Sequence, residues 1–112
     1  DMAIDKSAFP PEVLTKFQNA AAKPGALTAM INYYRANFKF FSKNTAKDWN
    51  ISNIPTLMIW GEADTALGKE LTYGTSLYVR NIQIKYIQDC SHWVQQERPE
   101  LVNQYLRSFL NN

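Results

Sequence analysis

In the first part of the chain, apolar residues recur every three to four positions, as they do along one face of an α-helix. The first such stripe follows a pair of prolines that suits a helix start, and it comprises Val13, Leu14, Phe17, Ala20 and Ala21. The second stripe comprises Leu27, Ile31, Tyr34 and Phe38. The pattern predicts one helix from the proline pair to residue 21 and another over residues 26–41, with a break between them at 23–25.

Beyond residue 50 the pattern changes to short apolar runs separated by polar turns. Residues 56–60 and 82–87 read as strands, residues 67–78 as a helix despite two glycines, and residues 99–110 as an amphipathic helix. This order predicts parallel strands and an α/β fold, with a helical domain over 1–48 and an α/β domain over 49–112. Because two parallel strands rarely make a stable sheet alone, we expect the chain to be part of a larger structure.

Composition narrows the functional classes. The 112 residues are 46% hydrophobic and 20% charged, with a net charge of +2, so we expect a globular, cytoplasmic chain with no nucleic-acid or membrane partner. The single histidine and single cysteine give neither a clustered metal site nor an internal disulfide, and we expect no metal and no cofactor. The four glycines lack the spacing of a nucleophile elbow, a phosphate-binding loop or a dinucleotide fingerprint.

Two residues that can perform acid–base chemistry follow the two expected strands. Asp64 comes four residues after the first strand, and His92 comes five residues after the second. Neighbouring parallel strands lie about 5 Å apart, so their C-terminal loops can bring the two side chains together. A carboxylate then orients the imidazole, whose other nitrogen takes a proton from water or a nucleophile. Taken singly, the aspartate also fits a turn former and the histidine an ordinary loop residue.

Two neighbouring residues have simpler interpretations. Cys90 is close to His92 in sequence, but catalytic partners are usually neighbours in space, so we interpret Cys90 as a buried structural residue. Glu97 precedes the last helix, and we expect its carboxylate to interact favourably with the positive end of that helix.

Three motifs resemble the C-terminal part of α/β-hydrolases of the epoxide hydrolase group. They are Trp60-Gly61-Glu62-x-Asp64, the string Asp89-Cys90-Ser91-His92-Trp93-Val94-Gln95-Gln96-Glu97-Arg98-Pro99, and Pro24-Gly25-Ala26-Leu27-Thr28-x-x-Ile31-Asn32-Tyr33-Tyr34-Arg35. The resemblance implies the end of a helical cap, followed by the last two strands and helices of the hydrolase core. It covers nearly the whole chain.

The resemblance also implies a mechanism. In this family an aspartate attacks an epoxide carbon to form an ester, and a histidine held by an acid activates the water that hydrolyses it. Two cap tyrosines hold and protonate the epoxide oxygen. The residues implied here are His92 as general base, Asp64 as its charge partner and Tyr34 as a cap tyrosine, with Tyr33 and Trp93 contacting the substrate.

The departures from the family pattern leave several functions open. The 112 residues contain neither a match to the aspartate nucleophile nor the family's His-Gly oxyanion segment, so we expect the isolated chain to be inactive. We expect it to need a missing N-terminal core segment, or to associate with itself. A dehalogenase of the same fold, with the same histidine and aspartate, is one alternative. A non-catalytic protein that covers its sheet edge with a partner is another.

Overall fold

The structure, a computed structural model, describes residues 2–41 and 51–111. It forms two units, one made of residues 2–8 and 51–111 and the other of residues 9–41. The domain boundary expected at 48/49 lies outside the described residues. Residues 2–8, grouped by the sequence pattern with the helical part, lie in the α/β unit because the backbone N–H groups of Ile4 and Asp5 donate hydrogen bonds to Glu97.

The helical unit consists of two helices, as the sequence predicted. Helix α1 (Pro11–Ala21) starts at the second proline of the pair, and helix α2 (Ala26–Phe41) follows directly after Gly25. Gly25 has a φ of 79°, a left-handed conformation that glycine adopts without steric cost, and this permits the sharp change of direction.

The α/β unit is built on two parallel strands. Strand β1 (Thr56–Gly61) pairs with strand β2 (Ile82–Ile87) in a register that places Thr56 opposite Ile82 and Gly61 opposite Ile87. A short helix α3 (Val94–Glu97) and the longer helix α4 (Pro99–Leu110) complete the chain. The predicted strands and C-terminal helix are therefore confirmed, as is their parallel pairing.

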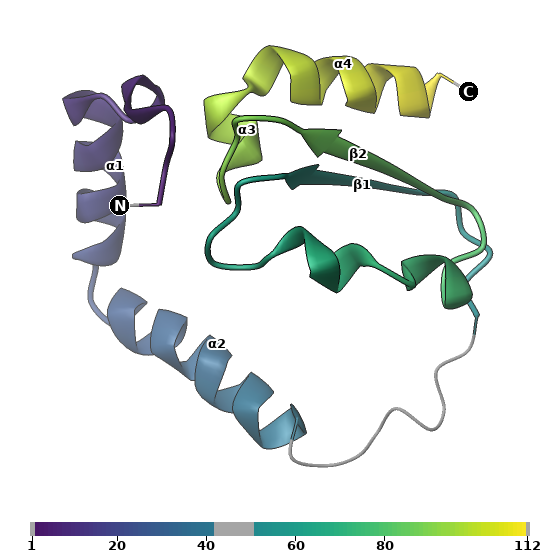
Figure 1. Cartoon of the computed structure of the whole chain (residues 1–112). Helices are drawn as coiled ribbons and strands as arrows, with labels where there is room; N and C mark the ends of the chain where they lie inside the picture. The colour runs from purple at the N-terminus through teal and green to yellow at the C-terminus, as the bar shows by residue number, and fades with distance from the viewer. Residues whose placement is uncertain (1, 42–50, 112) are drawn as a thin grey trace. The chain divides into compact units, whose positions relative to one another are not determined.

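The strand pair is covered on both faces (Figure 1). Helix α4 lies over one face, where Ile87 packs with Cys90 and Val102, and where Lys85 lies over the Tyr105 ring. The opposite face carries Tyr86, whose hydroxyl hydrogen-bonds the buried Thr72 hydroxyl at 2.5 Å. Neighbouring residues of β2 thus point to opposite layers, as the two-residue period of a strand requires.

The helix expected over residues 67–78 is wrong. This segment forms two short 3-10 turns instead, η3 (Lys69–Thr72) and η4 (Thr75–Leu77). Between them Tyr73 is extended and Gly74 has a φ of 76°, so the backbone leaves the helical region at two successive residues. The glycine penalty in this segment outweighed its apolar periodicity.

None of the helices described is both long and apolar enough to cross a membrane.

Candidate functional site

The loop after β1 holds the Asp64 carboxylate in one orientation. Its Oδ1 accepts hydrogen bonds from the backbone N–H groups of Ala66 and Leu67, both at 2.9 Å. The Leu67 carbonyl in turn accepts a hydrogen bond of 3.1 Å from the indole N–H of Trp60 in the strand. An aspartate that caps its own turn in this way leaves its second oxygen, Oδ2, directed elsewhere.

The loop after β2 is fastened to the loop after β1. The Glu62 N–H donates to the Ile87 carbonyl at 2.9 Å, and the Ala63 N–H donates to the Cys90 carbonyl at 3.1 Å. Gly61 permits this approach. A Cβ atom there would lie 2.5 Å from the Cys90 carbonyl oxygen and still closer to that of Ser91. Glycine is required because another backbone occupies the space of a side chain.

Asp64 and His92 meet between these loops. The Oδ2 atom of Asp64 lies 2.8 Å from Nδ1 of His92. The aspartate side chain is 5% exposed, whereas the histidine side chain is 33% exposed. A buried acceptor on Nδ1 favours the tautomer that carries its proton there, and Nε2 on the more exposed side is then the proton acceptor.

The environment of Asp64 keeps its carboxylate charged. Burial by itself would raise the pKa of Asp64, but hydrogen bonds from Leu67, His92 and Ala66 and the charge of His92 outweigh it, so the pKa lies below its ordinary value. A carboxylate that stays ionised can orient the ring and stabilise an imidazolium when His92 takes up a proton. The pair therefore has the chemistry of a general base with its charge partner.

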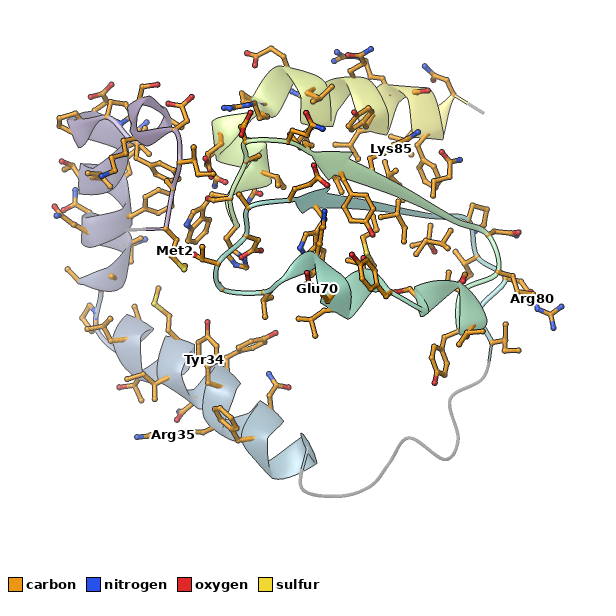
Figure 2. The ribbon with its side chains drawn as sticks, viewed as in Figure 1. Met2, Tyr34, Arg35, Glu70, Arg80 and Lys85 are labelled. Atoms are coloured by element: carbon orange, nitrogen blue, oxygen red, sulfur yellow. The ribbon has the colours of Figure 1, made fainter. Side chains whose placement is uncertain are left out.

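The other residues expected at the site lie in two places. The Trp93 ring lies edge-on to His92, with ring centroids 5.5 Å apart, so it is beside the acid–base pair. Tyr33 and Tyr34 lie in α2, in the helical unit, with 64% of Tyr34 exposed and their rings in an edge-on contact at 5.5 Å (Figure 2). Substrate contact by these three residues stays a prediction.

Cys90 is fully buried in the cluster with Ile87 and Val102, and burial raises the pKa of its thiol, with the Glu97 charge acting in the same direction. A buried thiol with a raised pKa is a poor nucleophile, so the structural interpretation of Cys90 is the one the geometry favours. Among the described residues, no three histidine, cysteine or carboxylate side chains gather as a metal site.

The hydrogen bonds of Glu97 were not predicted from the sequence. Its expected interaction with the positive end of α4 stays a prediction, but its carboxylate accepts hydrogen bonds from other segments. It is buried, with 4% of the residue exposed, and it accepts hydrogen bonds from Ile4 and Asp5 and from the N–H and hydroxyl of Ser91. No local pattern signals these contacts, because two of the partners are more than 90 residues away in the chain.

Comparison with known proteins identifies relatives of the chain. No protein-family model matches the chain. It is 35% identical over 104 residues to AB hydrolase superfamily protein YfhM of Bacillus subtilis, covering 93% of this chain and 35% of that protein. It is 37% identical over 90 residues to human epoxide hydrolase 4, covering 80% of this chain and 24% of that protein. It is 39% identical over 100 residues to epoxide hydrolase 3 of Xenopus tropicalis, covering 88% and 26%.

A solved structure gives the same result. The crystal structure of Bacillus megaterium epoxide hydrolase in complex with an inhibitor matches with a TM-score of 0.82 and 28% identity, over 97% of this chain and 40% of that one. The chain thus spans only 24% to 40% of the length of these four proteins. It is a partial homologue of the α/β-hydrolases of the epoxide hydrolase group.

Proposed function

We propose that this chain supplies the water-activating half of an epoxide hydrolase. The observation that carries the proposal is the contact between a buried, ionised Asp64 and the half-exposed ring of His92. The named relatives add the reaction, since several of them are epoxide hydrolases. A histidine held by a carboxylate is suited to take a proton from water at neutral pH.

The proposed reaction has two stages. A carboxylate nucleophile, supplied from outside these 112 residues, attacks an epoxide carbon, the ring C–O bond breaks, and the new alkoxide takes a proton from a phenol. In the second stage Nε2 of His92 takes a proton from water, and the hydroxide attacks the ester carbonyl. As the ester C–O bond breaks, the leaving alkoxide takes the proton of the newly added hydroxyl, so that the diol leaves and the carboxylate is restored. The imidazolium proton then returns through solvent to the phenolate, which restores the imidazole and the phenol. Asp64 stabilises the imidazolium formed in this stage.

Tyr34 is the proposed phenol, because the helix sequence around it resembles the family's cap. A phenol positioned at a developing alkoxide stabilises that charge and can donate its proton. The neighbouring Tyr33 and the ring of Trp93 are proposed to contact the substrate. The 112-residue chain alone is expected to be inactive, since it brings a base without the nucleophile.

A chimera tests the function. This chain would replace the segment of the Bacillus megaterium enzyme on which it superposes, so that the remainder of that epoxide hydrolase supplies the missing part. We expect a folded chimera to convert styrene oxide to its diol, and the same chimera with His92→Ala to lose turnover. Halide release from haloalkanes without diol formation would favour the dehalogenase alternative and overturn the proposal.

The two tyrosines can be separated in the same chimera. Tyr34→Phe removes the proposed proton donor and should lower kcat/KM for styrene oxide by about 10²-fold. Tyr33→Phe is the matched control, since it alters the neighbouring ring by the same single oxygen, and it should change kcat/KM far less. A larger loss with Tyr33→Phe would assign the donor role to Tyr33.

A further inference from the structure

The loop that carries His92 is hydrogen-bonded to the buried carboxylate of Glu97. Ser91, fully buried and directly before His92, donates both its backbone N–H, at 3.2 Å, and its hydroxyl to Oε1 of Glu97. The other oxygen, Oε2, accepts the backbone N–H groups of Ile4 at 3.0 Å and Asp5 at 2.9 Å. Each oxygen of the Glu97 carboxylate thus accepts two hydrogen bonds. The donors come from two segments that are far apart in the sequence, Ile4–Asp5 and Ser91.

The residue after Glu97 fastens the same loop at its other end. The Arg98 guanidinium donates 2.8 Å hydrogen bonds to the carbonyls of Asp89 and Glu97, and it lies 3.3 Å from the Asp5 carboxylate. Asp89 has a φ of 48°, which is uncommon for a residue other than glycine and persists only where neighbours hold it. Glu97 and Arg98 therefore hydrogen-bond the residues on either side of Cys90, Glu97 to Ser91 and Arg98 to Asp89.

The carboxylate of Glu97 is ionised in this setting. Burial by itself would raise the pKa of Glu97, but the hydrogen bonds from Asp5, Ser91 and Ile4 outweigh it and hold the pKa below its ordinary value. Hydrogen bonds to a charged acceptor are stronger than those between neutral groups. A charged, buried and fully partnered side chain gives the loop a more rigid support than apolar packing would.

We propose that Glu97 is a positioning residue for the His92 base, acting through Ser91 and anchored on the backbone of residues 4 and 5. Among the described residues no hydrogen bond joins Glu97 to the imidazole or to Asp64, so its effect reaches the ring through the peptide unit between Ser91 and His92. The name "base" rests on the proposed function, whereas the geometric effect on His92 does not. Segment 2–8, which directly precedes the helical unit, thereby becomes part of the support of the acid–base pair.

The test exploits the fact that His92 is the only histidine in the chain. Its Nδ1 proton, held between the ring and Asp64, can be followed by NMR in the full chain without assigning other imidazoles. Glu97→Gln keeps the size of the side chain but leaves only one oxygen to accept the four donors. We expect exchange of the Nδ1 proton with water to become about tenfold faster, as the loss of one hydrogen bond that holds the loop of His92 in place would produce.

Two comparisons separate positioning from general stability. Glu100→Gln makes the same change at an exposed position in the first turn of α4, and it should leave the exchange unchanged. A merely structural role for Glu97 would speed exchange of the backbone amides of β1 and β2 by the same factor, whereas positioning speeds the His92 ring proton selectively. The proposal would be overturned if the His92 ring proton of a folded Glu97→Gln chain exchanged at the wild-type rate. It would also be overturned if the ring proton and the backbone amides of β1 and β2 were all accelerated by the same factor.

Ser91→Ala keeps the proposal testable if Glu97→Gln does not fold. It removes only the hydroxyl donor and leaves the backbone N–H of residue 91 on the carboxylate, so we expect a smaller acceleration in the same direction, and an unchanged rate would overturn the proposal. In the chimera, Glu97→Gln should lower kcat with little change in KM. Altered exchange in a chimera that never hydrolyses epoxides would refute the proposed function and leave the positioning role intact.

Discussion

At the scale of the residue, the two carboxylate oxygens of Asp64 have different partners. Oδ1 satisfies the turn formed by Ala66 and Leu67, and Oδ2 faces His92. Both the position of the aspartate after its strand and its partnership with the histidine could be predicted from the sequence. Which oxygen binds the turn and which binds His92 could not be predicted, because this depends on the backbone path of the turn.

Asp64→Asn should separate the two uses. The amide can still accept the turn's N–H groups through its oxygen, but it presents an NH₂ group or a neutral oxygen to Nδ1 of His92 and cannot stabilise an imidazolium. In the chimera described above we expect kcat to fall by about 10²- to 10⁴-fold. Asp89→Asn is the matched control, at an exposed position in the next loop with a left-handed backbone that asparagine tolerates. Comparable kcat values for the two variants would contradict the role of Asp64.

Glu97 and Asp64 also set the response of the α/β unit to acid. The pKa of each carboxyl is lowered in the folded chain, so the unfolded chain binds protons more readily. The free energy of unfolding therefore decreases as the pH is lowered. Their contribution is complete above the unfolded pKa of about 4 and is lost as the pH falls through the lower folded values. Urea unfolding between pH 7 and 3 should show this loss, and Glu97→Gln should reduce the slope. An unchanged slope would mean that Glu97 is not the ionised anchor described.

At the scale of the element, the sequence predicted those segments whose pattern is strong and local. Helices α2 and α4 and both strands are where the periodicity places them, because each carries a continuous apolar stripe or run in its sequence. The segment between the strands was misread, since Gly74 breaks a helix that the apolar spacing favoured. The grouping of residues 2–8 with the second half was beyond reach, because it depends on Glu97, which lies more than 90 residues away.

Gly61 is the element-scale contact that brings the two loops of the site together. Gly61→Ala would place a methyl group against the carbonyl oxygens of Cys90 and Ser91, which are backbone atoms and cannot rotate away. We expect a loss of about 1–3 kcal/mol in the free energy of unfolding, measured with urea. Gly68→Ala is the control, because its methyl group meets only the flexible Glu70 carboxylate. Equal losses in both variants would show that the approach at Gly61 has no special cost.

At the scale of the whole molecule, many large apolar side chains of the described residues are exposed. In the part that the structure describes, only four hydrophobic residues are buried, whereas Ile54, Leu71, Leu77 and Leu110 of the α/β unit are largely exposed. Among residues 2–41 and 51–111, no further strand pairs with the outer edges of the two-stranded sheet. On the ground of these exposed residues, we propose that a complementary core segment pairs with the unit.

Native mass spectrometry of the purified material, beside a denatured intact mass, tests this association. We expect the 12.9 kDa chain to travel with a second, larger polypeptide, because that segment would cover the exposed apolar residues and supply the nucleophile. A dimer of the chain with itself would instead support the self-associating alternative. A stable monomer would contradict both forms of association.

The most direct test of the central claim is a covalent trap in the chimera. With His92→Gln, the nucleophile can still open styrene oxide, but no base activates the water that hydrolyses the ester. We expect the intact mass of the protein to rise by the mass of one styrene oxide molecule and to stay there, while the unsubstituted chimera turns over without accumulating an adduct. Rapid diol formation by the His92→Gln chimera, with no adduct, would show that His92 is not the base.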